Sequence, residues 1–217
     1  MYTSSETLLP PEEAKSMPDG RSTRGKERRE LLLQTTLKLI AERGVGAVSH
    51  RAVAEAAGLP LGSTTYWFDS RQQMLTEALE YFVRDEIAAL NDRLAGLRGS
   101  DLSRSRMVDE FTTILMLQLG EDRWRTVAQY TLLQEAIRLP EVEAVCRDWN
   151  AAWDTALAGV FESLGVAEPR LEAEMFLAML DGILLAQLAT PDPDVEQKLI
   201  RPALESWFSR LPSERNS

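Results

Sequence analysis

The 217-residue chain contains a single cysteine, Cys146, and a single histidine, His50. One cysteine cannot form a disulfide within the chain, and a zinc site needs several cysteine or histidine ligands. We therefore expect no metal site and interpret Cys146 as a small buried side chain. No glycine-rich phosphate-binding loop is present either, so the sequence predicts no cofactor.

Long apolar runs are also missing from the sequence. No stretch approaches about 18 consecutive apolar residues, so we expect no membrane-spanning helix. Residues 1–20 contain three prolines and several acids but no signal-peptide core, which indicates a disordered leader on a cytoplasmic protein. Strand-like alternation of apolar and polar residues is scarce, whereas 44% of all residues are apolar, enough for a packed core.

Positive charge is scarce overall but concentrated in one segment. The chain carries a net charge of -10, yet residues 21–51 hold eight cations and three anions, which leaves a net charge of -15 on the rest. A basic segment on an acidic body favours a local contact with a polyanion. A solvated charged helix face would give the same pattern.

Glycine and proline divide the chain into segments of helical length, which predicts an all-α fold of about nine helices. Ser49 is expected to cap the second helix, and Ser70 with Gln73 has the spacing of a capping box. Pro202 either kinks the last helix or marks its start near Arg201. The expected helices cover residues 25–43, 49–57, 60–68, 70 to about 96–99, 102–119, 123–138, 141–164, 169–189 and part of 194–211.

Residues 49–69, SHRAVAEAAGLPLGSTTYWFD, contain two short predicted helices on either side of Gly58-Leu59-Pro60. This arrangement is typical of a helix-turn-helix, whose second helix enters the major groove of DNA. We expect Val53, Thr65 and Phe68 to face the core. Hydroxyls can bond phosphates or bases, and small residues allow close approach. The positions expected to face DNA are Leu61, Gly62, Ser63, Thr64, Tyr66 and Trp67, although Trp67 could instead cover the core.

About fifty residues of this region resemble the DNA-binding domain of the tetracycline-repressor (TetR) family. That family has an "IA..AG" core, a "GTLYxYF" recognition helix and a following helix that begins "sKexLl". Seven residues separate Gly58 from Tyr66, where the family usually has six. Pro60 replaces the usual capping serine, and Arg71 the usual lysine. The matching residues are Gly44, Val48-Ser49, Val53-Ala54, Ala57-Gly58, Gly62, Tyr66, Phe68, Ser70-Arg71 and Leu75.

The resemblance implies a homodimer that binds a pseudo-palindromic double-stranded operator, usually as a repressor. It implies a phosphate contact for Tyr66 and a place near the DNA backbone for Arg71. His50 and Arg51, at the start of the second helix, suit phosphate contacts, although His50 could equally be a solvated surface residue. The expected DNA-binding residues are Ser49, His50, Arg51, Leu61, Gly62, Ser63, Thr64, Tyr66, Trp67 and Arg71.

Aromatic, methionine and amide side chains gather in the predicted helices between residues 102 and 164. A few polar groups in an apolar cleft are typical of a small-molecule pocket, and the resemblance implies that an effector binds between these helices. Core packing is the alternative role for each residue. We expect a small, largely apolar effector near Met116, Trp124, Tyr130, Gln134, Trp149 and Trp153.

The segment 169–189 is apolar on more than one face, which predicts a buried helix. Together with the last helix it resembles the pair that dimerises in the family as a four-helix bundle. The alternative is that these residues fill the core of one chain. The expected interface residues are Phe176, Met179, Leu180, Ile183, Leu184, Leu204 and Trp207.

The sequence therefore predicts a disordered leader over 1–20, a helix-turn-helix domain over 21–72, and an effector-binding and dimerisation domain over 73–217. An enzyme is disfavoured, because the one histidine lies in the helix-turn-helix and the carboxylates form no distinctive motif. The remaining alternative is a helical interaction protein that does not bind DNA.

Overall fold

The computed structural model describes residues 20–97 and 103–212, and the leader expected over 1–20 lies outside the described residues except for Gly20. Regular structure in the described part is entirely helical, as the sequence predicts. The helices are α1 Gly20–Arg43, α2 His50–Ala56, α3 Leu61–Trp67, α4 Arg71–Leu97, α5 Arg104–Leu119, α6 Arg123–Ala136, α7 Pro140–Ser163, α8 Pro169–Ala189 and α9 Arg201–Ser209, with short turns η1 Val45–Ala47 and η2 Glu196–Ile200.

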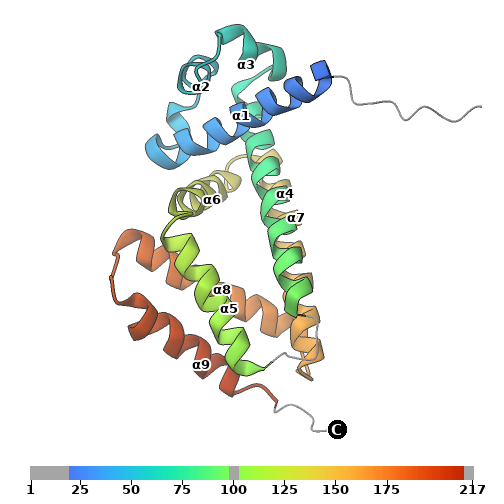
Figure 1. Cartoon of the computed structure of the whole chain (residues 1–217), viewed down its shortest axis with the longest axis vertical. Helices are drawn as coiled ribbons and strands as arrows, with labels where there is room; N and C mark the ends of the chain where they lie inside the picture. Colours follow the sequence, from blue (N-terminus) through green and yellow to red (C-terminus); the bar gives the residue numbers. More distant parts are fainter. Residues whose placement is uncertain (1–19, 98–102, 213–217) are drawn as a thin grey trace, which may run out of the picture.

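The helices form an elongated molecule with two distinct ends (Figure 1). Helices α1, α2 and α3 occupy one end, and α4 leaves this group to run alongside α7. Helix α6 packs beneath α1, while α5, α8 and α9 form the opposite end. None of the described helices combines the length and the apolar character needed to cross a membrane.

The two serine caps expected from the sequence, at α2 and α4, form in the structure. The Ser49 hydroxyl accepts a hydrogen bond from the backbone N–H of Ala52 at 3.1 Å, as an N-cap does. The Ser70 hydroxyl accepts from the N–H of Gln73 at 3.1 Å, and the Gln73 side chain accepts from the N–H of Asp69 at 2.6 Å. The capping box therefore forms, but Gln73 bonds the N–H of Asp69, whereas the usual capping box uses the N–H of the capping residue, here Ser70. At the other end of the chain, α9 begins at Arg201, directly after the π-helical turn η2.

Two hydrophobic cores hold the helices together. The first core joins α1, α2 and the first half of α4 to α6 and α7, and it includes Cys146, which is buried as expected. It therefore crosses the boundary expected near residue 72. The second core joins α5, α7, α8 and α9 around Phe176. The rings of Phe111, Phe161, Trp207 and Phe208 all contact Phe176, with centroids 4.8–5.7 Å away.

The residues expected at a dimer interface lie in this second core instead. The side chains of Phe176, Leu180, Ile183, Leu184, Leu204 and Trp207 are buried within the single chain, and Met179 packs partly buried against them. The expectation was wrong because α8 is apolar on two faces, and the sequence does not reveal which face its own chain covers. The outer face keeps Leu171, Met175 and Leu185 exposed by 49%, 49% and 44%.

We predict that Phe176→Ala lowers the free energy of unfolding by about 3–5 kcal/mol, because it removes a fully buried ring from the centre of the aromatic cluster. Chemical denaturation followed by circular dichroism measures this loss. Ile137→Ala is the control, since Ile137 is 86% exposed and its loss should stay within about 0.5 kcal/mol. Equal effects of the two substitutions would contradict the assignment of this core.

Candidate nucleic-acid interface and cavity

Helices α2 and α3 are joined by a tight turn that sets their crossing. Gly58 adopts φ +65°, a left-handed conformation that favours glycine, and the Leu59 N–H then donates to the Ala54 carbonyl at 2.9 Å. Pro60 follows as the N-cap of α3 and provides no side-chain cap, so α3 starts at Leu61. Val53, Ala54 and Phe68 are buried beneath the pair, which fixes α3 on the outside of the molecule.

The inward face of α3 differs by one residue from the expected one. Thr64, expected to face DNA, is fully buried and donates to the carbonyls of Leu61 at 2.8 Å and His50 at 3.2 Å. Thr65, expected to face the core, is exposed. Because the Thr64 hydroxyl donates to backbone carbonyls, it can be buried without being left unpaired, and threonine can occupy the inner face.

The family pattern explains this register when it is counted from Gly62. The stretch from Gly62 to Phe68 has seven residues, as does "GTLYxYF", so this helix carries no insertion. Thr64 then takes the place of the pattern's leucine, an apolar position that suits the interior. Thr65, and not Tyr66, takes the place of its first tyrosine.

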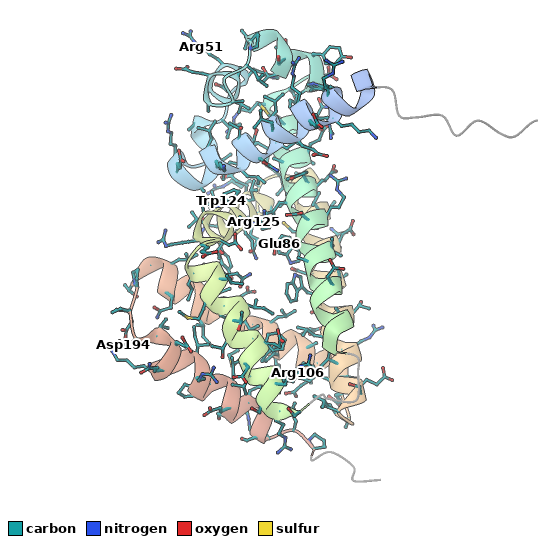
Figure 2. The ribbon with its side chains drawn as sticks, in the orientation of Figure 1. Arg51, Glu86, Arg106, Trp124, Arg125 and Asp194 are labelled. Atoms are coloured by element: carbon teal, nitrogen blue, oxygen red, sulfur yellow. The ribbon has the colours of Figure 1, made fainter. Side chains whose placement is uncertain are left out.

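The outer face of α3 presents aromatic and small side chains. Tyr66 is 77% exposed and Leu61 is 52% exposed, with Gly62 on the same surface and Ser63 half-buried. Trp67 is half-buried, because its indole packs near Gly25 of α1 and against the first core. The Trp67 and Tyr66 rings meet edge to face, with their centroids 4.9 Å apart. Figure 2 shows Arg51 of α2 pointing outward at the same end of the molecule.

Basic residues of α1 lie beside this outer face, a feature absent from the expected site. Arg24, Lys26 and Arg28 line an open groove together with Ser63 and Tyr66 of α3. The net charge of residues 21–51 is the sequence signal that could have identified them. Sequence reasoning noted that charge but did not place it, because the packing of α1 beside α3 is a tertiary contact.

Arg71 is exposed, but its guanidinium bonds to the protein backbone. Its Nε donates to the carbonyl of Val48 at 2.9 Å, and its Nη2 donates to that of Val45 at 2.6 Å. These bonds tie the start of α4 to the turn η1 that precedes α2.

Nearby, Ser49 caps α2, and the Nδ1 atom of His50 is buried without a hydrogen-bond partner among the described residues.

Two adjoining cavities of about 280 and 250 Å³ lie in the helical body. The larger cavity lies between α5, α6, α7 and α8, and the smaller one between α4, α5, α6 and α7. They share four lining residues: Ile114, Gln118, Gln129 and Trp153. Known ligand pockets measure about 300–1,000 Å³, and the two cavities together reach that range.

Of the residues expected at an effector pocket, Trp149 and Trp153 line these cavities. Tyr130 does not line the cavities itself, but its hydroxyl donates to the cavity-lining Asp181 at 2.6 Å. The other three expected residues do not line either cavity. Trp124 packs against the first core with Lys38 above its ring, Met116 packs against the second core, and Gln134 is exposed. Helical spacing identifies residues that share a face but not the element that covers it.

An arginine of α6 connects the cavity wall to α4, and sequence reasoning missed it because its partners are about forty residues away. The Arg125 guanidinium donates to Asp85 at 2.6 Å and to Glu86 at 2.7 Å. Figure 2 shows Arg125 of α6 close to Glu86 of α4. It also lies over the rings of Phe82 and Trp124, at 5.2 and 5.8 Å from their centroids. Burial opposes the charge, but the bonds to Glu86 and Asp85 outweigh it and raise the pKa of Arg125.

Two family models match the chain. The model of the tetracyclin repressor-like C-terminal domain matches residues 102–210, half of the chain. The model of bacterial regulatory proteins of the tetR family matches residues 32–78. The HTH-type transcriptional repressor KstR2 of Rhodococcus jostii is 42% identical over 69 residues, which are 31% of this chain and about a third, 34%, of that repressor's length.

Solved structures resemble the chain over most of its length. A TetR-family member from Streptomyces coelicolor has a TM-score of 0.69 and 27% identity, and the match covers 86% of this chain and 99% of that one. The multidrug binding protein EbrR, solved in complex with ethidium, has a TM-score of 0.65 and 27% identity with the same coverage.

We predict that Thr64→Val lowers the free energy of unfolding by about 1–3 kcal/mol, because the substitution keeps the shape but removes a buried hydroxyl that donates to two carbonyls. Thr65→Val is the matched control and should stay within about 0.5 kcal/mol, since Thr65 is exposed. Thermal denaturation compares the two variants. A larger loss for Thr65→Val would show that the inner face of α3 is assigned incorrectly.

Proposed function

The chain belongs to the tetracycline-repressor family of regulators, and on that basis we propose that it is a DNA-binding transcriptional repressor that a small molecule releases from its operator. The observation that carries the DNA-binding part is the position of α3. Its outer face is exposed beside the basic residues of α1, so one surface offers both base-reading and phosphate-binding groups. We assign residues 21–72 to DNA binding and 73–217 to effector binding and dimerisation.

Within this surface, α3 is the helix that we place in the major groove. Leu61, Gly62, Ser63 and Thr65 then face base edges, with the small residues allowing close approach. Tyr66 and the cations Arg24, Lys26, Arg28 and Arg51 reach the phosphates on either side. Arg71 acts indirectly, because its bonds to Val45 and Val48 hold the turn before α2 in place.

The adjoining cavities are the proposed effector site. Aromatic walls with a few amides are typical of small-molecule pockets, and the related EbrR binds ethidium. The smaller cavity borders α4, whose first turns pack against α1 in the first core. A ligand that displaces α4 would therefore move the recognition helix, and a duplex tolerates little change in the spacing of two such helices.

The exposed outer face of α8 is the proposed dimer contact. Leu171, Met175, Gly182 and Leu185 recur at helical spacing along it, and Leu199 of η2 is 40% exposed at the same end of the chain. Contiguous exposed apolar residues mark interaction sites. A second copy of the chain is the proposed partner. A two-fold dimer would present two α3 helices to half-sites about 34–36 Å apart.

We predict that the protein binds a pseudo-palindromic duplex with an affinity that falls steeply with salt, because each neutralised phosphate releases counterions. Tyr66→Phe should lower the affinity roughly tenfold for every sequence alike, whereas Thr65→Ala or Ser63→Ala should change the preferred base at one or two positions. Fluorescence anisotropy over a salt series, after selection of a preferred duplex from a random library, measures both effects.

Tyr81→Phe on α4 is the matched control and should bind DNA like the parent, since Tyr81 lies away from α3 and its hydroxyl accepts from Gln34. A folded protein that selects no sequence from the library would contradict the proposal. That result would favour a helical interaction protein without DNA binding.

We predict that Leu185→Asp weakens self-association at least roughly tenfold, about 1.4 kcal/mol, because it places a charge in the apolar face of α8. Sedimentation equilibrium measures the dissociation constant. The control is Ile137→Asp, which introduces the same charge at an 86% exposed residue after α6 and should leave self-association unchanged. Dimers of unchanged strength in Leu185→Asp would place the interface on another surface.

A further inference from the structure

The cavity walls carry an excess of negative charge. Asp154, Glu174 and Asp181 line the larger cavity, and no lysine, arginine or histidine is among its lining residues. None of these three carboxylates forms an ion pair within the described part of the chain. The smaller cavity adds Asp85, Glu86 and Asp122 against the single cation Arg125, which already pairs with Asp85 and Glu86.

The same walls are aromatic. Trp149 and Trp153, one helical turn apart on α7, line the larger cavity together with Phe111 of α5. The face of an indole ring attracts cations, and it also offers a flat apolar surface for an aromatic ligand. Carboxylates and indole faces in one cavity therefore favour a ligand that is both positively charged and apolar.

Asp181 is held in a defined orientation. Its Oδ1 accepts a hydrogen bond from the Tyr130 hydroxyl at 2.6 Å, which leaves Oδ2 to interact with a ligand. Burial raises the pKa of Asp181, although the bond from Tyr130 lowers it. Burial also raises the pKa of Asp154, and the charge of Glu174 raises it further. A positive charge in the cavity would favour the ionised forms of Asp181 and Asp154.

A metal ion is the other positive partner that carboxylates can bind. Nowhere in the described residues do three or more histidine, cysteine, aspartate or glutamate side chains come together closely enough to hold a metal ion. The carboxylates are instead distributed over α7 and α8 around an aromatic wall. This spacing suits a charge spread over a larger organic molecule.

We propose that the effector is an organic cation with a flat aromatic body, which packs against Trp149 and Trp153 and is neutralised by Asp154, Glu174 and Asp181. The proposal rests on the proposed function of the cavity as the effector site, and it replaces the largely apolar effector expected from the sequence. Two adjoining cavities of about 280 and 250 Å³ offer room for a ligand of about three fused rings.

The test compares three ligands of the same ring system that differ in charge. Isothermal titration calorimetry, at slightly alkaline pH and without DNA, measures the binding of 10-methylacridinium, neutral acridine and acridine-9-carboxylate to the full-length protein. We expect the cation to bind at least roughly tenfold more tightly than acridine, about 1.4 kcal/mol, and the anion to bind most weakly. Equal affinity for the cation and for acridine, or failure of all three to bind at millimolar concentration, would overturn the proposal.

Asp181→Asn then tests the role of charge at constant shape, because the amide oxygen can still accept the Tyr130 bond. It should weaken binding of 10-methylacridinium about tenfold, about 1.4 kcal/mol, and leave acridine binding almost unchanged. Asp148→Asn is the matched control, because Asp148 lies on the exposed side of α7 and lines neither cavity. Equal loss of binding for the cation and the neutral ligand would also overturn the proposal.

Folding of the variant can be checked independently. Since the folded-state pKa of Asp181 is raised, the stability contributed by this group decreases as pH rises through that pKa, and the ionised form costs stability at neutral pH. Asp181→Asn should therefore melt no lower than the parent. If it does melt lower, Glu174→Gln provides the same comparison of cation and neutral ligand, because Glu174 also lines the larger cavity.

Operator affinity without any ligand tests the proposed function separately. If the protein binds its operator but binds acridine more tightly than the cation, the proposed regulatory function stands and the proposed effector class is wrong. If the protein binds the cation more tightly but selects no duplex, the proposed effector class stands and the proposed regulatory function is wrong.

Discussion

The stacking of Phe82 on Trp149 connects the two adjoining cavities to the first core, which lies beneath the helix-turn-helix. Phe82 lies on α4 and Trp149 on α7, and their ring centroids are 5.0 Å apart with an angle of 28° between the planes. Phe82 lines the smaller cavity and Trp149 the larger one. Both rings belong to the first core, which also contains Leu33, Leu37 and Val53 beneath the helix-turn-helix. Because interiors are close-packed, a shift of either ring must be accommodated by neighbouring side chains of this core.

Charge is separated along the same axis as the two proposed binding sites. The segment 21–51 is positive and presents Arg24, Lys26 and Arg28 beside α3, whereas the cavity walls are lined by carboxylates. DNA and an organic cation would therefore each meet a surface of opposite charge. Arg125 lies between the two regions and holds α6 to α4 through Asp85 and Glu86. A cationic ligand in the smaller cavity would compete with Arg125 for these carboxylates, which gives it a direct means of displacing α4.

Local signals in the sequence predicted most of the fold. Serine, proline and glycine residues near the helix ends placed most helix boundaries, because these residues act on the backbone close to them in sequence. The faces of short or uniformly apolar helices were harder to predict. Helix α3 has seven residues and no side-chain cap, so its inward threonine was misplaced by one position. Helix α8 is apolar on two faces, and only the packing of α5 and α9 shows which one its own chain buries.

Residues of the candidate sites were likewise predictable where they lie close together in sequence, and not where distant segments meet. Trp149 and Trp153 were predicted together because they lie four residues apart on one helix. Gln134 was misplaced because nothing in the sequence states which face of α6 is covered. The contacts of Arg125 with Asp85 and Glu86, and the position of the α1 cations beside α3, join segments far apart in the chain. Such tertiary contacts leave no local pattern from which to predict them.

The most direct test of this account is the thermodynamic coupling between the cavity and the operator. The measurement uses a small molecule that crystallography places in the cavity, and it determines operator affinity with and without that molecule and the affinity for the molecule with and without operator. The account predicts that each lowers the affinity for the other by the same factor, of about 5–150-fold. A molecule that occupies the cavity and leaves operator affinity unchanged would contradict it.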